Sequence, residues 1–281
     1  MFTLVARAEF ANIEHTDHID SSKNASRDDS VFVPGAGALY KITDHFAVRG
    51  SVNKAATMSG LDPDGNEVKE ESTNYEMGFK VASDDQTKMA DVTAFYNDYQ
   101  NITGTCTVSA GCTGNAVDSQ YNGGQARVYG IEGIYAQGFS YGKWWFPIQF
   151  NATLIQAQFA SSFNSTNAEW GIGTVEEGDP LPYVPNVFYT LTGGTEYGPW
   201  KQEIAFVYQG KMPDQSVATD RREIDAFGVI DWTGRYEFSK ATTIYAKVDN
   251  VLDREYAVSI RPSGYRPGKP QSFGLGLTYA F

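Results

Sequence analysis

The feature that most constrains the fold is an alternation of apolar and polar side chains with a period of two residues. In residues 200–209 the large apolar side chains, Ile204 and Phe206 among them, fall on one face of an extended segment, with Gln202 as the one exception on that face. Glu203 falls on the opposite face, and residues 73–83 alternate in the same way. Because successive side chains of a β-strand point to opposite faces, this period indicates strands and not helices. We therefore expect an all-β chain.

Charged residues stand in the middle of these segments, on the face opposite the apolar one. A lysine or arginine turned toward lipid at the bilayer midplane costs about 2–4 kcal/mol in a membrane barrel. The segregation therefore suits a barrel with a wet interior, although a soluble β-sandwich also alternates. The charged residues expected to line the interior are Arg7, Glu9, Arg49, Glu76, Lys80, Lys201, Glu203, Asp231, Arg235 and Glu237.

The connections favour the membrane barrel over the sandwich. Short turns alternate strictly with long polar loops along the chain. Outer-membrane barrels have this distribution, with short turns on the periplasmic side and long loops outside the cell. The turns are expected at 43–45, 83–87, 140–143, 197–200 and 239–241, and the loops at 14–30, 58–72, 103–125, 161–185, 211–225 and 259–270.

The segments between these connections predict a transmembrane antiparallel β-barrel with about twelve strands, most of them long enough for a tilted crossing. Aromatic residues such as Trp144, Trp145 and Trp200 gather near the strand ends, which is typical of the girdles at the two membrane interfaces. The strands are expected near 2–13, 31–42, 46–57, 73–83, 88–102, 126–139, 144–160, 186–197, 200–210, 226–238, 242–258 and 271–281.

The composition argues against several other classes of protein. No uninterrupted run of roughly 18 apolar residues occurs, so a transmembrane helix is not expected. The net charge of −12 argues against nucleic-acid binding, which needs a basic patch. The 3 histidines offer no Ser-His-acid arrangement, and no nucleotide-binding glycine motif is complete. We therefore expect no enzyme, no cofactor and no bound metal.

Asn250–Tyr256, Glu71–Gly78 and Leu181–Pro185 are motifs that resemble those of TonB-dependent receptors of the bacterial outer membrane. Asn250–Tyr256 resembles the family's Asn-aliphatic-hydrophobic-Asp-x-x-Tyr sequence, which ends the penultimate strand. Glu71–Gly78 is similar to its Ser-x-Asn-Tyr-Glu-x-Gly element, and Leu181–Pro185 to its Leu-Pro-Tyr-x-Pro element. The end of the chain resembles the signal that the barrel-assembly machinery reads, carried here by Phe273, Leu275, Leu277, Tyr279 and Phe281.

This resemblance implies an outer-membrane receptor that takes up a ferric chelate, a siderophore or iron citrate, with energy from the TonB complex. Ser259–Pro270 looks most like the ferric-dicitrate branch. Barrels of this family have about 22 strands around an N-terminal plug. The resemblance therefore implies that residues 1–281 are the C-terminal part of the barrel. It also implies that the signal peptide, the plug domain and the TonB box are absent from this sequence.

Two groups of loop residues are candidates for specific roles. Cys106 and Cys112 lie in a long outward loop of an exported protein, where two cysteines indicate a disulfide. Guanidinium groups offer forked donors that match carboxylates. The arginines of the last two long loops are therefore candidates to contact an anionic chelate, although acidic neighbours or lipopolysaccharide are alternative partners. These residues are Arg221, Arg222, Arg261 and Arg266, with Tyr265 as a planar contact.

A second function is compatible with the same pattern. A self-contained barrel of about twelve strands, acting as a passive pore or an autotransporter-type translocator, would have a similar length. An outer-membrane lipase of similar size would need a catalytic histidine on a strand facing outward, and the sequence offers none. Single-channel conductance of the refolded chain distinguishes a closed pore from part of a larger receptor.

Overall fold

The chain is built around one antiparallel sheet. The computed structural model describes residues 1–16, 18, 24–58, 69–105, 107–108, 120–261 and 264–280. Within them lies a 12-stranded sheet in the order β1-β2-β3-β4-β5-β8-β9-β12-β13-β16-β17-β20, so each long strand pairs with the next one along the chain. The all-β prediction and the number of long strands are confirmed.

The strands of the sheet and their small companions have the following bounds. The long strands are β1 (Phe2–His15), β2 (Ala25–Lys41), β3 (Phe46–Thr57), β4 (Glu70–Ala82), β5 (Lys88–Gln100), β8 (Ala126–Tyr141), β9 (Trp144–Phe159), β12 (Val187–Tyr197), β13 (Trp200–Gln209), β16 (Phe227–Glu237), β17 (Thr242–Asp249) and β20 (Ser272–Tyr279). Four small antiparallel pairs occupy the long connections: β6 (Thr103–Thr105) with β7 (Gln120–Asn122), β10 (Phe163–Ser165) with β11 (Gly173–Val175), β14 (Met212–Pro213) with β15 (Glu223–Ile224), and β18 (Ala257–Ser259) with β19 (Arg266–Pro267).

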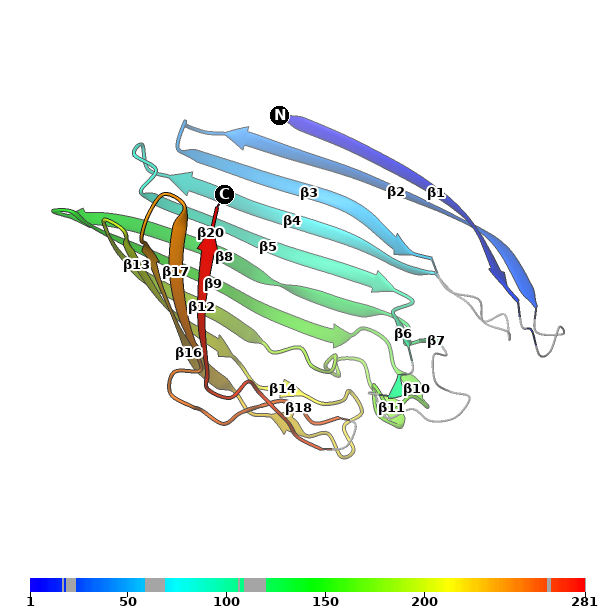
Figure 1. The fold of residues 1–281 in the computed structure, drawn as a ribbon. Coiled ribbons are helices and arrows are strands. Elements are labelled where there is room, and N and C mark those ends of the chain that lie inside the picture. The colour runs from blue at the N-terminus through cyan, green and yellow to red at the C-terminus, as the bar shows by residue number, and fades with distance from the viewer. Residues whose placement is uncertain are drawn as a thin grey trace.

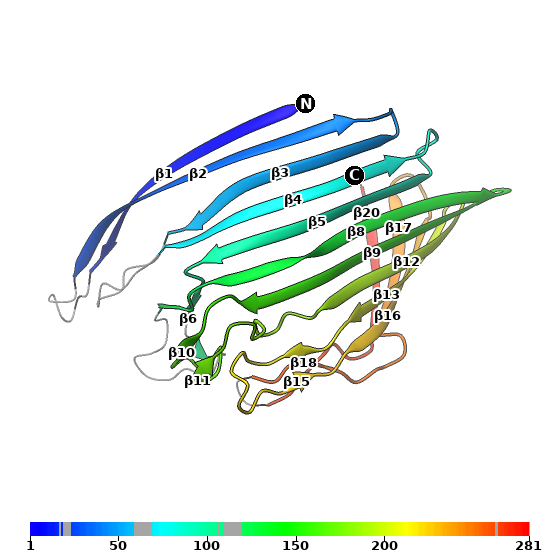
Figure 2. The ribbon, with the colours of Figure 1, turned by 180° about the vertical axis from the view of Figure 1, so that it is seen from behind.

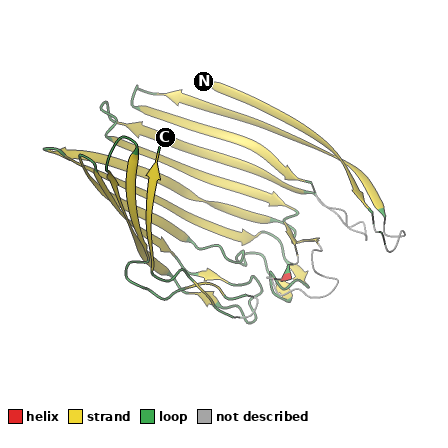
Figure 3. Ribbon diagram, viewed as in Figure 1, coloured by secondary structure: helices red, strands yellow, loops and turns green. Residues whose placement is uncertain are grey.

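The sheet is strongly curved but not closed. Figures 1 and 2 show β17 and β20 standing opposite β8 and β9 across its concave side. Among the described residues no ladder joins β1 to β20, so the sheet keeps two free edges. The long connections gather at the end opposite the chain termini, and Figure 3 shows the irregular segments collected there. We call this end the mouth.

The strand register places the charged residues predicted to line the interior on one face of the sheet. Lys201 pairs with Arg235, and Ala205 with Asp231, on one face of β13 and β16, whereas Ile204 pairs with Trp232 on the other. Arg49, Asp91, Thr93 and Glu132 line a hollow of about 320 Å³. The polar face lines this hollow, and we call it the inner face.

A glycine lets one charged side chain reach across a neighbouring strand. Arg49 of β3 lies opposite Gly78 of β4, which lies opposite Thr93 of β5. The Nη2 of Arg49 donates to Oδ1 of Asp91 at 2.6 Å and to Oγ1 of Thr93 at 2.5 Å. A Cβ at position 78 would lie 2.5 Å from the carbonyl oxygen of Val92. The glycine therefore leaves the space that joins three strands on the inner face.

The opposite face of the sheet exposes more large apolar side chains than the surface of a soluble protein normally does. Leu4 is 85% exposed, Met77 73% and Leu275 81%. These side chains belong to strands at both edges and in the middle of the sheet, so the apolar surface is continuous. No helix in the described part of the chain has the length and apolarity needed to cross a bilayer.

Two strand boundaries differ from the predicted ones by more than five residues. β2 begins at Ala25 and not near residue 31, because its polar start pairs with the end of β1. Asp29 in this extension has a side chain only 3% exposed, and it forms ion pairs with Arg27 and Lys69. β17 ends at Asp249 and not near residue 258. Phe281 lies outside the described residues, whereas Phe273, Leu275, Leu277 and Tyr279 share the outer face of β20.

The early end of β17 is caused by Asn250, which has a φ of +49° and is 2% exposed. Its backbone N–H donates to Oδ1 of Asp231 at 2.8 Å. Its Nδ2 donates to the carbonyl oxygens of Arg254 at 2.9 Å and Lys269 at 3.0 Å. The amide thus ties the exit of β17 to the segment that enters β20, and a long loop can separate two strands that remain in register.

The turn between β4 and β5 is organised by Asp85. Ser83 Oγ donates to Oδ1 of Asp85 at 2.6 Å, and Thr87 donates to the same oxygen through its backbone N–H at 3.1 Å and its Oγ1 at 2.8 Å. These hydrogen bonds lower the pKa of Asp85 to about 2, and the bond from Ser83 has the largest effect. The ionised carboxylate therefore satisfies three donors of a five-residue turn.

We expect the stabilisation from Asp85 to depend on pH in one direction. Because the folded pKa lies below the ordinary value of about 3.9, the contribution is complete above that value and disappears as pH falls toward 2. The urea midpoint of Asp85→Ala should therefore lie below that of the wild type at pH 6, and the two should converge near pH 2. A difference that stays constant between these pH values would contradict the assignment.

Adjacent positions on β13 test the two faces of the sheet. Ile204 lies on the apolar face and is 53% exposed, whereas Ala205 lies opposite Asp231 on the polar face. In a lipid bilayer Ile204→Lys should reduce the unfolding free energy by about 2–4 kcal/mol. Ala205→Lys is the matched control and should change it by less than about 1 kcal/mol. Equilibrium unfolding in vesicles measures both, and equal losses would argue against lipid on the outer face.

Candidate functional site

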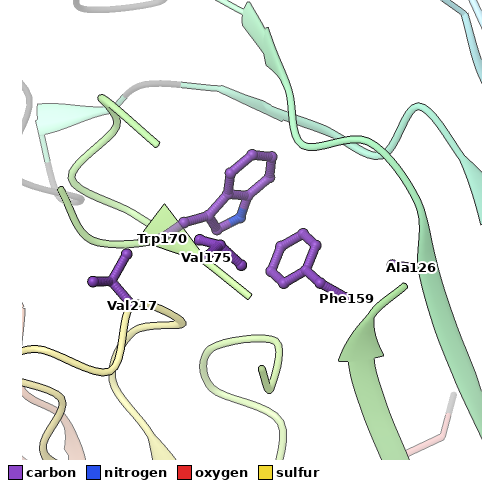
Figure 4. Packing of buried hydrophobic residues seen from close by; sticks show 5 residues of the cluster. All are labelled: Ala126, Phe159, Trp170, Val175 and Val217. Carbon is purple, nitrogen blue, oxygen red and sulfur yellow. The ribbon is translucent and has the colours of Figure 1, made fainter. Parts of the chain in front are cut away.

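The long connections at the mouth pack into one unit on the concave side of the sheet. Phe159, Phe163 and Trp170 form a triangle of rings with centroids 5.2–5.3 Å apart. Val175 and Val217 complete the cluster. Figure 4 shows these two valines with Phe159, Trp170 and Ala126 in close view. Phe159 ends β9 and pairs with Ala126 of β8. The loops are therefore anchored to the inner face of the strands and do not extend freely into solvent.

Trp170 joins three different connections. Its carbonyl oxygen accepts the backbone N–H groups of Ser216 and Val217, both at 2.9 Å. A Cβ at Gly123, in the connection after β5, would lie 2.1 Å from the indole ring, so only glycine fits under it. Gly171 has a φ of +93°, which turns the chain toward Val217. Burial of one indole thus holds the connections after β5, β9 and β13 together.

A second cluster joins the last connections to the same unit. Met212, Ile224 and Ile260 are buried, and Tyr183 and Ala257 pack against them. The backbone N–H of Tyr183 donates to the carbonyl oxygen of Pro213 at 2.8 Å. The connections after β9, β13 and β17 therefore share one apolar contact, and the polar residues between them are held at fixed positions.

Asp214 lies between two of the predicted arginines. Its side chain is 1% exposed, and its Oδ2 lies 3.1 Å from Nη2 of Arg222 and 4.0 Å from Nε of Arg261. Oδ1 accepts the backbone N–H of Arg222 at 2.8 Å, and Oδ2 accepts Nε–H of the same residue at 3.2 Å. Arg261 also donates to Oε1 of Gln215. A buried carboxylate therefore gathers arginines from two separate connections.

Arg221 is held by a different carboxylate. Its Nη2 lies 2.6 Å from Oδ1 of Asp179 and also donates to the carbonyl oxygen of Ser216. This ion pair joins the connection after β9 to the one after β13. The three arginines and two aspartates together carry a net charge of +1, because each aspartate cancels one arginine. The arrangement can bind an anion, since charge-assisted donors exceed the internal acceptors.

The remaining predicted residues lie apart from this group. Arg266 is exposed and lies opposite Ser259 in the β18–β19 pair, and the neighbouring Tyr265 is 66% exposed. Cys106 and Cys112 lie outside the residues that the structure describes, so their disulfide stays a prediction. Three of the four arginines are thus brought together, and Arg266 and Tyr265 are presented to solvent.

Sequence reasoning missed the partners that hold the arginines. Asp179, Asp214 and Gln215 stand in polar loops, where a solvated side chain is the ordinary expectation. No spacing relates Asp179 to Arg221, which are 42 residues apart. The only sequence signal is that Asp214 follows a Met-Pro pair and Arg222 precedes Glu-Ile, which become β14 and β15.

Lys211, in the connection after β13, forms ion pairs with other acids. Lys211 lies 3.4 Å from Glu223 and 3.5 Å from Asp225. These carboxylates raise the pKa of Lys211, and Glu223 has the largest effect. The lysine therefore remains charged, but its partners are exposed acids and it does not contribute to the group around Asp214.

Comparisons with known proteins agree on the fold. The family model described as TonB dependent receptor-like, beta-barrel matches residues 2–251. Vitamin B12 transporter BtuB of Vibrio cholerae serotype O1 is 33% identical over 81 residues, which are 28% of this chain and 13% of the transporter.

Solved structures of similar fold are larger than this chain. The unliganded ferric citrate transporter FecA gives a TM-score of 0.76 at 16% identity, over 99% of this chain and 42% of that one. The siderophore receptor PiuA from Acinetobacter baumannii gives 0.70 at 15% identity, over 99% and 40%. At these identities the likeness concerns the fold alone. The chain spans less than half of the length of these structures.

Removing the central indole tests whether the loops form one unit. Trp170→Ala deletes a side chain packed by three connections, and such truncations cost about 3–5 kcal/mol. We expect faster amide exchange in residues 160–186 and 210–226, with the strands unchanged. The matched control is Ile172→Ala, two residues away, because Ile172 is 76% exposed. Equal effects of the two variants on amide exchange would show that Trp170 does not hold the loops.

Proposed function

Because the chain belongs to the TonB-dependent receptor-like β-barrel family, an outer-membrane family of transporters and receptors, we propose that it forms part of a receptor that takes up an anionic ferric chelate. The supporting observation is the group of arginines held by Asp179 and Asp214 at the mouth. Its chemistry is binding, and the proposal includes no catalytic step.

The chelate is proposed to be of the siderophore or iron citrate type. The proteins of similar fold include a ferric citrate transporter and a siderophore receptor. A carboxylate-bearing chelate matches the forked donors of arginine. A chain with a net charge of −12 repels anions over most of its surface. The three clustered arginines, which exceed their two aspartate partners by one charge, therefore favour this class over neutral ligands.

The proposed contacts are the four predicted arginines and Tyr265. Arg222 has a side chain 54% exposed, and Arg266 and Tyr265 are exposed as well. These three are proposed to touch the chelate directly. The side chains of Arg221 and Arg261 are 23% and 14% exposed, so they are proposed to contribute mainly charge while bracing the loops.

The rest of the receptor is proposed from the two free edges of the sheet. Unpaired strand edges cannot face hydrocarbon, because their backbone groups would lack hydrogen-bond partners. Further strands are therefore proposed to pair with β1 and β20, with residues 1–281 as the C-terminal part of the barrel. A plug domain and the TonB complex would supply gating and energy. The apolar residues of β20 would engage the barrel-assembly machinery, and the outer face lipid and lipopolysaccharide.

The arginines are tested by binding of ferric citrate to the full-length protein in outer membranes. Replacing Arg221, Arg222, Arg261 and Arg266 together with Ala should weaken binding by at least about tenfold, since one charged hydrogen bond contributes about 1.5–3 kcal/mol. Replacing the same residues with Lys keeps the charge but removes the fork, and should give an intermediate loss.

Arg235→Ala is the matched control for this experiment. Arg235 lies on the inner face near a short turn and pairs with Glu237 at 3.1 Å, far along β16 from the mouth. Its replacement should leave the affinity unchanged. Unchanged affinity in the quadruple Ala variant would remove these residues from the proposal. A stable conducting pore formed by residues 1–281 alone would favour the self-contained barrel.

A further inference from the structure

We propose that Asp214 is a positioning residue for chelate binding, which fixes the guanidinium of Arg222 in the orientation that meets the ligand. This inference rests on the proposed function and assigns a role to a residue that is not expected to touch the chelate. Asp214 is fully buried at the base of the tip formed by residues 214–222, between β14 and β15.

The geometry around Asp214 fixes both the backbone and the side chain of Arg222. The backbone N–H of Asp214 donates to the carbonyl oxygen of Arg222 at 3.0 Å. In return, Oδ1 of Asp214 accepts the backbone N–H of Arg222 at 2.8 Å. The carboxylate thus takes the place of a backbone carbonyl in closing the tip. This closure fixes the position of Arg222, which lies opposite Asp214 at the base of the tip.

The second carboxylate oxygen orients the guanidinium. Oδ2 of Asp214 accepts Nε–H at 3.2 Å and lies 3.1 Å from Nη2. These two nitrogens form one side of the guanidinium, so the Nη1 side points away from Asp214. The side chain of Arg222 is 54% exposed although its partner is 1% exposed. Asp214 therefore holds one edge of the guanidinium, and the other edge has no partner among the described residues and is open to a carboxylate in solution.

A second arginine keeps this carboxylate from cancelling the charge of the site. Nε of Arg261 lies 4.0 Å from Oδ2 of Asp214, and its Nη2 donates to Gln215. One carboxylate between two guanidinium groups leaves a net charge of +1. Ordering a long side chain before the ligand arrives reduces the entropy lost on binding. Asp214 therefore supplies preorganisation without removing the attraction for an anion.

A double-mutant cycle in the full-length protein tests this role, with ferric citrate as the probe. Asp214→Asn and Arg222→Gln should each weaken binding by about tenfold. Because Asp214 acts through Arg222, the double variant should bind about tenfold more weakly than the wild type, and not about a hundredfold as independent effects would give. Asp225→Asn, which removes an exposed carboxylate of the same connection, is the matched control and should bind as the wild type does.

Protease sensitivity of the loops provides a measurement that does not depend on the ligand. The double variant removes the Asp214–Arg222 pair as a unit, and Arg261 keeps its hydrogen bond to Gln215, so the loops should resist protease as in the wild type. Losses that multiply in the double variant, or unchanged binding by Asp214→Asn, would overturn the positioning role while leaving the proposed function intact. If the wild type binds neither ferric citrate nor another anionic chelate, the proposed function fails and this inference fails with it.

Discussion

Every part of this structure depends on the continuous hydrogen-bonded ladder of its long strands. In hydrocarbon no water is present to satisfy a backbone group, so each strand must pair with a neighbour. A sequential antiparallel sheet meets this requirement with short turns at one end, and it fixes which side chains face lipid. The separation of charged and apolar faces follows from that register. The same register places Gly78 beside Arg49, and the missing side chain of Gly78 lets Arg49 join three strands on the inner face.

The rigid strand ends allow the long connections to form a packed unit. Phe159 ends β9 and Ala126 begins β8 on the inner face, and Trp170 packs on them from the connection after β9. Because the indole of Trp170 excludes water from the backbone around it, the carbonyl oxygen of Trp170 can accept the backbone N–H groups of Ser216 and Val217. Asp214 and Arg221 then occupy fixed positions beside that segment. Polar residues at the mouth are therefore placed by apolar contacts that lie beneath them.

The sequence predicts the parts of the fold that repeat and misses those that occur once. Alternation identifies the long strands, because a wrong face would place charge against lipid. The start of β2 escapes this rule, since Asp29 is buried by Arg27 and Lys69 and not by an apolar pattern. The end of β17 depends on one side-chain amide with a φ of +49°. The partners of the arginines, Asp179 and Asp214, were not predictable because loop packing alone brings them into contact.

The same packing bears on how an acidic protein would retain the anion site proposed above. A free arginine on a mobile loop would pair with any of the numerous carboxylates nearby, since the chain has 34 acidic residues and 22 basic ones. Burial of Asp214 restricts that pairing to one edge of Arg222, and Asp179 does the same for Arg221. The internal carboxylates therefore select which donors stay available. In the receptor proposed above, selectivity for an anionic chelate would arise from the acids that hold the arginines as much as from the arginines themselves.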